Sequence, residues 1–366
     1  MRAGFIGLGL IGGSIAKALK EFKICDYICA YDYYVENNDG RKNPNLIMAK
    51  EDGTLDEIHT SLNDFSTLDI IYLCAPVKTN INYLKKLISI VNDDCIITDV
   101  GSVKGDIHRA AMELNANNIF VGGHPMAGSE KTGYSNSSAS ILENAYYVIT
   151  SAKDTPAKKI DILTNICRQI GTIPINIDYM QHDRYVAAIS HVPHLIAVCL
   201  VNMVRDNDTD GIMRMIAAGG FKDITRIGSS SPVMWENICL NNTDAILEFL
   251  SKFRDNIDLA YDYVKNHDGA SINKIFSTSK EYRDSFDNAS TIKYTTFYEI
   301  FVDVKDEKGM IATISMLLAK NNINIKNIGI VNNREFDNGV LKVELQTQSE
   351  MEAAKVLLTD KEFKVY

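Results

Sequence analysis

A glycine-rich segment near the N-terminus has the composition of a phosphate-binding turn. It is Gly7-Leu8-Gly9-Leu10-Ile11-Gly12, which follows a short apolar run and precedes a helical pattern. Glycines in such a turn let the backbone approach a pyrophosphate, toward which the first amides of the helix point. Asp32 ends the next predicted strand, where an acid holds a ribose 2′-hydroxyl and repels a 2′-phosphate. The pattern predicts a dinucleotide site that prefers NAD to NADP, to which we also assign Ala75 and Pro76. A turn that only permits tight packing is the alternative.

Two polar segments follow later predicted strands, at residues 99–104 and 122–130. Ligands bind beyond the carboxyl ends of the strands in an open parallel sheet. His124 titrates near neutrality, so it could accept a proton from a substrate hydroxyl while hydride leaves the same carbon. Ser102 could hydrogen-bond that hydroxyl or orient the imidazole, and a helix N-cap is the competing interpretation.

Two further polar clusters lie in the helical middle of the chain, at residues 190–194 and 219–226. His191 and His194 suggest a metal, but a third ligand at suitable spacing is missing and Pro193 disturbs the helix, so we predict no metal site. Lys222 and Arg226 are four residues apart and share a helical face, which fits capture of a carboxylate. A surface ion pair with Asp223 is an equal alternative.

The elements that must position these residues divide into three regions. Seven short apolar runs separated by helical patterns predict an α/β domain of the Rossmann type, a doubly wound and largely parallel sheet, over residues 1–178. The predicted strands are 3–6, 27–31, 70–75, 95–99, 119–122, 145–150 and 172–177. Residues 179–286 predict an all-helical domain. Its clearest helix carries an apolar stripe from Ile246 to Val264, interpreted as core that in part buries against a second copy of the chain.

A small third domain is predicted over residues 294–366. A polar linker at residues 285–291 precedes a strand at 297–304, a helix face from Met310 to Leu318 and a strand at 323–331. Asp337-Asn338-Gly339 predicts a turn, followed by a strand at 340–346. Ser349 and Glu352 predict a capping box that opens a helix to Leu358, before a last strand at 363–365. The order βαββαβ is ferredoxin-like.

Composition excludes several classes of function. The net charge of −9 is the wrong sign for a protein whose main partner is nucleic acid or an anionic membrane surface. Seven scattered cysteines without a C-x-x-C pair indicate neither a disulfide framework nor a zinc ribbon, which favours a cytoplasmic protein. No uninterrupted apolar run approaches the ~18 residues of a membrane helix. Several glycines and Lys17 argue against a signal peptide in the apolar stretch 5–19.

Five segments, in this order and spacing, resemble the prephenate/arogenate dehydrogenases of tyrosine biosynthesis: residues 7–14, 99–104, 124–130, 190–194 and 221–226. The resemblance covers residues 1 to about 285, and His-Pro-Met-Ala-Gly-Ser-Glu at 124–130 is its most specific part. Residues 294–366 resemble an ACT domain, an amino-acid-sensing module found behind some of these enzymes. In place of the Pro-Gly common in the first loop of that module, this chain has Lys308-Gly309.

The resemblance implies oxidative decarboxylation of prephenate to 4-hydroxyphenylpyruvate with NAD and without a metal, since aromatisation drives the loss of carbon dioxide. It assigns catalysis to His124, Ser102 and His194, and the substrate site to Arg226, Lys222, Ser129, Glu130 and His191. Within that site Arg226 would hold a carboxylate, Glu130 would gate the entrance and Lys222 would come from a neighbouring subunit. A homodimer that binds L-tyrosine as an effector is the expected assembly.

Three alternatives remain open at the level of sequence. Arogenate differs from prephenate only in carrying an amino acid in place of the pyruvyl ketone, and nothing in the motifs separates the two. Another NAD-dependent dehydrogenase, of the β-hydroxyacid type, would carry a catalytic lysine on the first long helix after the sheet. A non-enzymatic regulator that senses NAD and an amino acid is the third.

Overall fold

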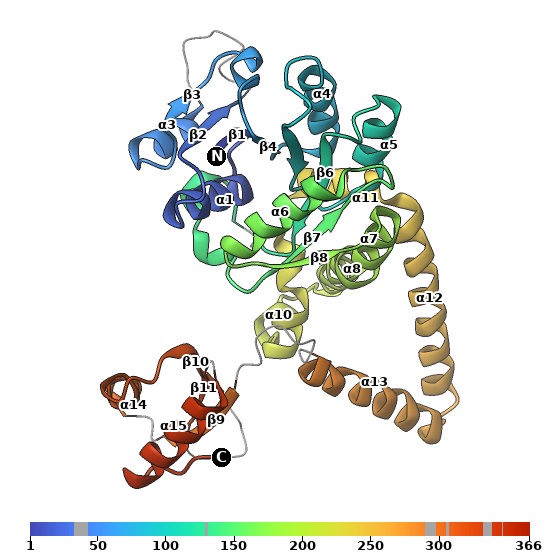
Figure 1. The fold of residues 1–366 in the computed structure, drawn as a ribbon. Coiled ribbons are helices and arrows are strands. Elements are labelled where there is room, and N and C mark those ends of the chain that lie inside the picture. Colours follow the sequence, from blue (N-terminus) through green and yellow to red (C-terminus); the bar gives the residue numbers. More distant parts are fainter. Residues whose placement is uncertain (33–42, 129–130, 290–297, 305–306, 332–338, 346) are drawn as a thin grey trace. The chain divides into compact units, whose positions relative to one another are not determined.

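A computed structural model describes residues 1–366 except for 33–42, 129–130, 290–297, 305–306, 332–338 and 346 (Figure 1). The chain forms two compact units, Met1–Leu259 and Ala260–Tyr366, and each is described by itself.

The first unit is built on an eight-stranded sheet with the order β3-β2-β1-β4-β5-β6-β7-β8 (Figure 1). Its strands are β1 (Arg2–Ile6), β2 (Tyr27–Tyr31), β3 (Glu57–Ile58), β4 (Ile70–Leu73), β5 (Ile96–Asp99), β6 (Phe120–Pro125), β7 (Tyr146–Thr150) and β8 (Ile173–Asn176). All neighbours pair in parallel except β6 and β7. The predicted Rossmann-type sheet is confirmed, with one short strand, β3, that the sequence did not reveal.

Successive residues of a strand point to opposite sides of the sheet. Both faces therefore carry apolar side chains, and helices cover both. Phe5 of β1 stacks on Tyr72 of β4 at 4.9 Å, in the core beneath α1 (Leu10–Glu21), α3 (Pro44–Glu51) and α6 (Ala157–Gln169). Their neighbours Ile6 and Ile71 point the other way, toward α4 (Val77–Leu87) and α5 (Gly105–Glu113). Short 3₁₀ turns at Leu62–Phe65, Tyr134–Asn136 and Ala139–Ile141 complete the layers. The carboxyl edge of the sheet is thereby left for the polar segments.

A helical region follows β8 in the same unit. It comprises α7 (Tyr179–Val186), a π-helical turn (Ala187–His191), α8 (Val192–Asn207), α9 (Ile212–Ile216), α10 (Gly219–Thr225), a 3₁₀ turn (Arg226–Ser229), α11 (Pro232–Asn241) and the part of α12 (Thr243–Lys265) that ends at Leu259. The π turn precedes Pro193, which has no N–H to donate to the preceding turn. His194 Nδ1 instead donates to the carbonyl oxygen of Ser190 at 2.8 Å. The proline therefore interrupts the helix as expected without ending it.

The stretch Tyr179–Asn207 is long and apolar enough to span a membrane by length and composition alone. One such helix is weak evidence for a membrane, because core helices of soluble proteins have the same composition. In this chain the stretch carries polar groups that bond to the sheet domain, described below.

The apolar stripe of α12 is not core within one chain. Ile246 is buried, but Ile257, Tyr261 and Val264 are 51%, 65% and 64% exposed. The interpretation of the whole stripe as core is therefore wrong for the single chain. An exposed apolar face of this kind needs a covering partner. We interpret this face of α12 as a contact with a second copy of the chain.

The second unit carries α13 (Gly269–Ala289) and a three-stranded antiparallel sheet of order β10-β11-β9. Its elements are β9 (Tyr298–Val304), α14 (Met310–Lys320), β10 (Ile325–Val331), β11 (Gly339–Leu345) and α15 (Gln348–Asp360). The last segment adds to the free edge of β9 through a single bridge between Val302 and Val365. This arrangement is the predicted βαββαβ order, with a bridge in place of the last strand.

Three local predictions in this unit need correction. Residues 285–289, expected in a linker, continue α13, since a polar composition does not prevent a helix. The capping box lies two residues earlier than predicted: Thr347 is the N-cap and exchanges hydrogen bonds with Glu350. Gly339 belongs to β11, while the rest of the predicted turn lies outside the described residues.

We expect Ile257→Asp to convert a dimer into monomers, because a carboxylate in an apolar interface is costly while the exposed side chain adds little to folding of its own chain. Light scattering coupled to size-exclusion chromatography measures the mass. Ser251→Asp adds the same charge about 120° around α12 from Ile257, outside the apolar stripe, and serves as the control. An unchanged mass for Ile257→Asp would show that this face is not the interface.

Candidate active site

The glycine-rich turn has the geometry of a dinucleotide cradle. Gly7 has a φ of +81°, which favours glycine, and its amide donates to the carbonyl of Tyr31 at 3.0 Å. A Cβ at Gly12 would lie 2.9 Å from Cys74 Sγ, so a side chain there would push the helix off the sheet. A Cβ at Gly9, the N-cap of α1, would meet nothing within 4 Å. The residues therefore fit a pyrophosphate, with open space at a helix N-terminus.

The remaining residues assigned to the cofactor lie around this cradle with different exposure. Leu8 is buried in the core, so only its backbone can face a ligand, whereas Leu10 and Ile11 are half-buried. Ala75 and Pro76 follow β4, and the Ala75 amide donates to Asn80 Oδ1 at 3.0 Å. Asp32 follows β2 and accepts from Asn43 Nδ2 at 2.9 Å. These residues lie in the loops that follow β1, β2 and β4 and in the first turn of α1.

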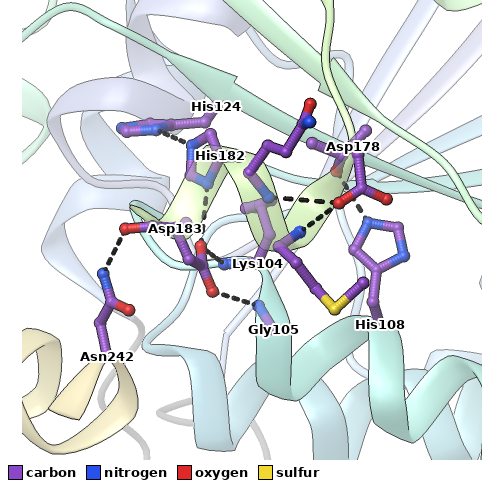
Figure 2. A network of polar contacts seen from close by, with 12 residues as sticks. Lys104, Gly105, His108, His124, Asp178, His182, Asp183 and Asn242 are labelled. Atoms are coloured by element: carbon purple, nitrogen blue, oxygen red, sulfur yellow. Dashed lines mark hydrogen bonds and ion pairs between the residues drawn. The ribbon is translucent and has the colours of Figure 1, made fainter. Parts of the chain in front are cut away.

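His124 lies in a hydrogen-bonded chain of three side chains (Figure 2). Its Nδ1 lies 2.8 Å from Nε2 of His182, and Nδ1 of His182 lies 2.9 Å from Oδ1 of Asp183. Sequence reasoning placed His124 in a loop, but β6 continues through Pro125, so the histidine is held by the sheet. His182 and Asp183 lie on α7, whose N-cap Asp178 accepts from the amides of Met180 and Gln181.

The Asp183 carboxylate fixes the protonation pattern of this chain. Its oxygens accept from the amides of Lys104 and Gly105, both at 2.7 Å, so it also caps the N-terminus of α5. A carboxylate only accepts, and therefore His182 carries its proton on Nδ1 and leaves Nε2 as an acceptor. Nδ1 of His124 must then be the donor between the rings. This leaves Nε2 of His124 with a lone pair, ready to take a proton from a ligand.

Electrostatics favour the neutral form of His124. Burial lowers the pKa of His124 well below its usual range, and nearby His182, Lys104 and His191 act in the same direction. The imidazole is therefore unprotonated at neutral pH, as a base must be.

A buried ion pair supports the strand that carries His124. The Lys104 ammonium bonds the Asp99 carboxylate and donates to the carbonyl of Gly123 at 2.7 Å. Burial lowers the pKa of Lys104, and Asp99 opposes that shift. Asp99 Oδ1 also accepts from the amide of Gly123 at 3.3 Å. These contacts fix the backbone next to His124 from β5 and from the start of α5.

Ser102 lies in the bend between β5 and α5 and is half-buried. The N-cap of α5 is Lys104 and the helix amides are capped by Asp183, so the N-cap interpretation of Ser102 does not hold. Both predicted roles of its hydroxyl, a hydrogen bond to a substrate hydroxyl and orientation of the imidazole, stay predictions.

His191 and His194 occupy different environments around Trp235. His194 stacks on the indole with ring centres 3.9 Å apart. His191 is 1% exposed, and Asn242 Nδ2 lies 3.1 Å from its Nδ1 and donates to the Asp183 carbonyl at 2.8 Å. Its burial favours a supporting role for His191 over direct contact with a substrate. Among the residues that the structure describes, no group of three or more ligating side chains could hold a metal.

The cationic pair lies further along the helical region. Lys222 is on α10 and Arg226 starts the 3₁₀ turn that follows, and both are exposed. Ser129 and Glu130 lie outside the described residues.

Sequence reasoning missed His182, Asp183 and the structural use of Lys104 and Asp99. The available signal was a His-Asp pair one turn after the N-cap Asp178, directly after the last strand. Nothing in the sequence links that pair to His124, which lies 58 residues upstream.

A glycine cradle, an acid after β2 and a neutral histidine at the sheet edge define a Rossmann-type dehydrogenase. A family model described as the nucleotide-binding domain of prephenate dehydrogenase matches residues 15–175, and one for its dimerization domain matches residues 178–278.

Full-length relatives extend this likeness. The prephenate dehydrogenase of Bacillus subtilis is 34% identical over 352 residues, which cover 95% of this chain and 93% of the relative. That of Lactococcus lactis is 30% identical, covering 96% of each. A prephenate dehydrogenase from A. aeolicus, crystallised with hydroxyphenyl propionate and NAD+, has a TM-score of 0.71 at 30% identity over 78% of this chain and 98% of its own. Synechocystis arogenate dehydrogenase has a TM-score of 0.68 at 28% identity, over 78% and 100%. The chain belongs to the prephenate dehydrogenase family.

We expect the protein to lose stability as the pH falls below about 6.5. Burial lowers the pKa of His108 to about 3 and that of His191 to about 4, whereas both would titrate near 6.5 in the unfolded chain. The unfolded state therefore binds more protons between these values, and at pH 5 each histidine lowers the free energy of unfolding by about 2 kcal/mol. Urea unfolding at pH 7.5 and pH 5 measures the loss.

His108→Gln removes one titrating group while keeping an amide near the Thr150 hydroxyl, which His108 Nε2 contacts at 2.7 Å. The loss in free energy of unfolding between pH 7.5 and pH 5 should be smaller in this variant. It should be unchanged in His267→Asn, a control at an exposed position. Equal losses in both variants would contradict the assignment to buried histidines.

Proposed function

We propose that the chain catalyses NAD-dependent oxidative decarboxylation of prephenate to 4-hydroxyphenylpyruvate. The observation that carries this proposal is the His124–His182–Asp183 chain, which presents a neutral imidazole nitrogen at the same carboxyl edge of the sheet as the dinucleotide cradle. Support for this substrate comes from the Bacillus subtilis and Lactococcus lactis relatives, which match over nearly their whole length.

The residues fit the proton balance of this reaction. NAD, when bound, accepts the hydride from the ring carbon that bears the hydroxyl. Nε2 of His124 takes the hydroxyl proton, so that a carbonyl forms at that carbon. Loss of the ring carboxylate as carbon dioxide leaves a phenolate oxygen, to which His124 can return the proton. The net change is prephenate and NAD to 4-hydroxyphenylpyruvate, carbon dioxide and NADH.

His182 and Asp183 support the charged form of His124 during this cycle. Once His124 holds the proton, its Nδ1–H donates to His182, and the Asp183 carboxylate lies one ring further along. A fixed chain of acceptors stabilises an imidazolium without reorganising at the moment of transfer. The same contacts hold the ring plane before the reaction.

Substrate contacts are assigned from the family pattern. We assign Ser102 and His194 to the reacting end of the substrate, with the ring of His194 fixed by Trp235. Arg226 is assigned to a substrate carboxylate by a bidentate contact, and Lys222 to the site of a neighbouring subunit. Ser129 and Glu130 complete the substrate contacts. His191, also expected there from the family pattern, is assigned a supporting role because it is buried.

Arogenate is the second candidate substrate, supported by the likeness to Synechocystis arogenate dehydrogenase. Parallel assays with both compounds separate the two. The β-hydroxyacid alternative has less support, because Tyr179–Asn207, the first long helical stretch after the sheet, contains no lysine.

Residues 1–178, 179–286 and 294–366 are our proposed domains. The exposed face of α12 and the match to a dimerization domain support a homodimer. None of the seven cysteines is in a disulfide, which supports a cytoplasmic location. The ferredoxin-like order of the C-terminal unit supports an ACT-like domain that binds L-tyrosine.

Prediction for the base: with prephenate and NAD, His124→Asn should lower kcat by ~10² to 10⁴ while NAD binding stays nearly intact, as typical for a lost general base. NADH absorbance and carbon dioxide release measure turnover, and fluorescence titration measures NAD binding. For the unmodified enzyme, the acid limb of the pH profile should lie below the usual histidine range, because the pKa of His124 is lowered. Near-normal turnover of the variant would remove His124 from the mechanism.

Prediction for regulation: L-tyrosine should lower the activity of the full chain, and a chain ending at Lys293 should be active but insensitive to tyrosine. The α14 N-terminus follows Gly309, whose φ is +93°, and offers amides to a carboxylate. A coupling of roughly 1–3 kcal/mol would change substrate affinity by about 5- to 150-fold. If neither tyrosine nor phenylalanine changes activity or Tm, the unit serves only dimerisation.

A further inference from the structure

Asn43, the N-cap of α3, makes two polar contacts with its side chain. Its Oδ1 accepts from the amide of Asn45 at 2.9 Å, and its Nδ2 donates to Oδ2 of Asp32 at 2.9 Å. The Asn43 side chain is 5% exposed, and both of its contacts are part-buried. The two ends of one amide thus join a helix start to the acid that follows β2.

The first contact determines the orientation of the second. Only an oxygen can accept from the amide of Asn45, which fixes Oδ1 on that side and turns the NH₂ group toward Asp32. The donor is therefore set by the helix cap. A carboxylate that receives a fixed N–H donor is oriented by that hydrogen bond.

The helix that carries Asn43 is fixed independently of Asp32. Asn45 Oδ1 accepts from the amide of Tyr134 at 3.2 Å. At the other end of α3, the Tyr134 hydroxyl donates to Asp52 at 2.7 Å and lies 2.8 Å from Thr54 Oγ1. The Tyr134 ring also lies beneath Lys17 of α1, 4.3 Å from its ammonium. Asn43 is thus mounted on a rigid frame.

We propose that Asn43 is a positioning residue that orients the Asp32 carboxylate for the adenosine ribose of NAD and so contributes to selection of NAD over NADP. This inference rests on the role proposed for Asp32. The acceptor for a ribose hydroxyl is then already oriented before NAD binds. The free energy of NAD binding therefore does not have to cover the ordering of the Asp32 side chain.

Asn43→Asp tests the proposal because it separates the two contacts. The new carboxylate still caps α3, but it has no donor for Asp32 and repels it. At pH 8 the Kd for NAD should rise about tenfold, the effect of losing a hydrogen bond to a charged group, with kcat at saturating NAD within about twofold of normal. At pH 6 the Kd should recover, since two carboxylates in contact share a proton and that proton restores the donor.

Asn45→Asp is the matched control. It adds the same charge two residues away, keeps the acceptor for Tyr134 and does not contact Asp32. The ion pair between Asp52, at the far end of α3, and Lys17 of α1 is unchanged in every variant. Fluorescence titration with NAD and NADP gives Kd, and Tm reports on folding. If Asn43→Asp folds poorly, Asn43→Ser keeps a capping oxygen and should weaken NAD binding without recovery at pH 6.

The proposal is wrong if Asn43→Asp binds NAD normally at pH 8, or if Asn45→Asp weakens NAD equally. Asp32→Asn separates this failure from that of the proposed site. If Asp32→Asn weakens NAD and Asn43→Asp does not, only the positioning role fails. If Asp32→Asn also binds NAD normally, the assignment of Asp32 itself fails.

Discussion

The carboxylate of Asp183 is the contact on which the active site depends most. It accepts two backbone amides at the start of α5 and the ring proton of His182, and it thereby joins the helical region to the sheet domain. Because a carboxylate only accepts, the tautomers of neutral His182 and His124 follow without further choice. One buried anion thus sets the position of a helix, the protonation of two rings and the free nitrogen of the base.

The same site also carries a cost in stability. Lys104 and Asp99 are fully buried, and such a pair is retained only when its hydrogen bonds are complete. Here the ammonium also reaches the carbonyl of Gly123, and Asp99 receives the amide of the same residue. The pair is better understood as fixing the backbone beside His124 than as a source of stability. The buried histidines nearby are neutral and can accept protons. Their protonation on unfolding lowers the free energy of unfolding in acid.

Two surfaces of the chain are suited to a group that comes from outside it. The turn at Gly9 opens toward a phosphate, and the apolar face of α12 requires a covering partner. Both follow from the same physical rule, since open helix amides and exposed apolar stripes are costly unless a ligand or another chain satisfies them. The proposed homodimer would cover the second of these surfaces, and bound NAD would occupy the first.

The sequence by itself determined the parallel sheet, the glycine turn, Asp32 and the candidacy of His124, because these depend on local periodicity and on residue types at short spacing. It did not reveal the two-residue strand β3, the exposure of the α12 stripe or the partners of His124. A stripe at helical spacing looks the same whether it packs within a chain or against another one. The contact between His124 and His182 joins a central strand to a helix beyond the sheet. Only the tertiary structure decides such a pair, because its geometry depends on how the helical region packs on the sheet edge and not on any repeat in the chain.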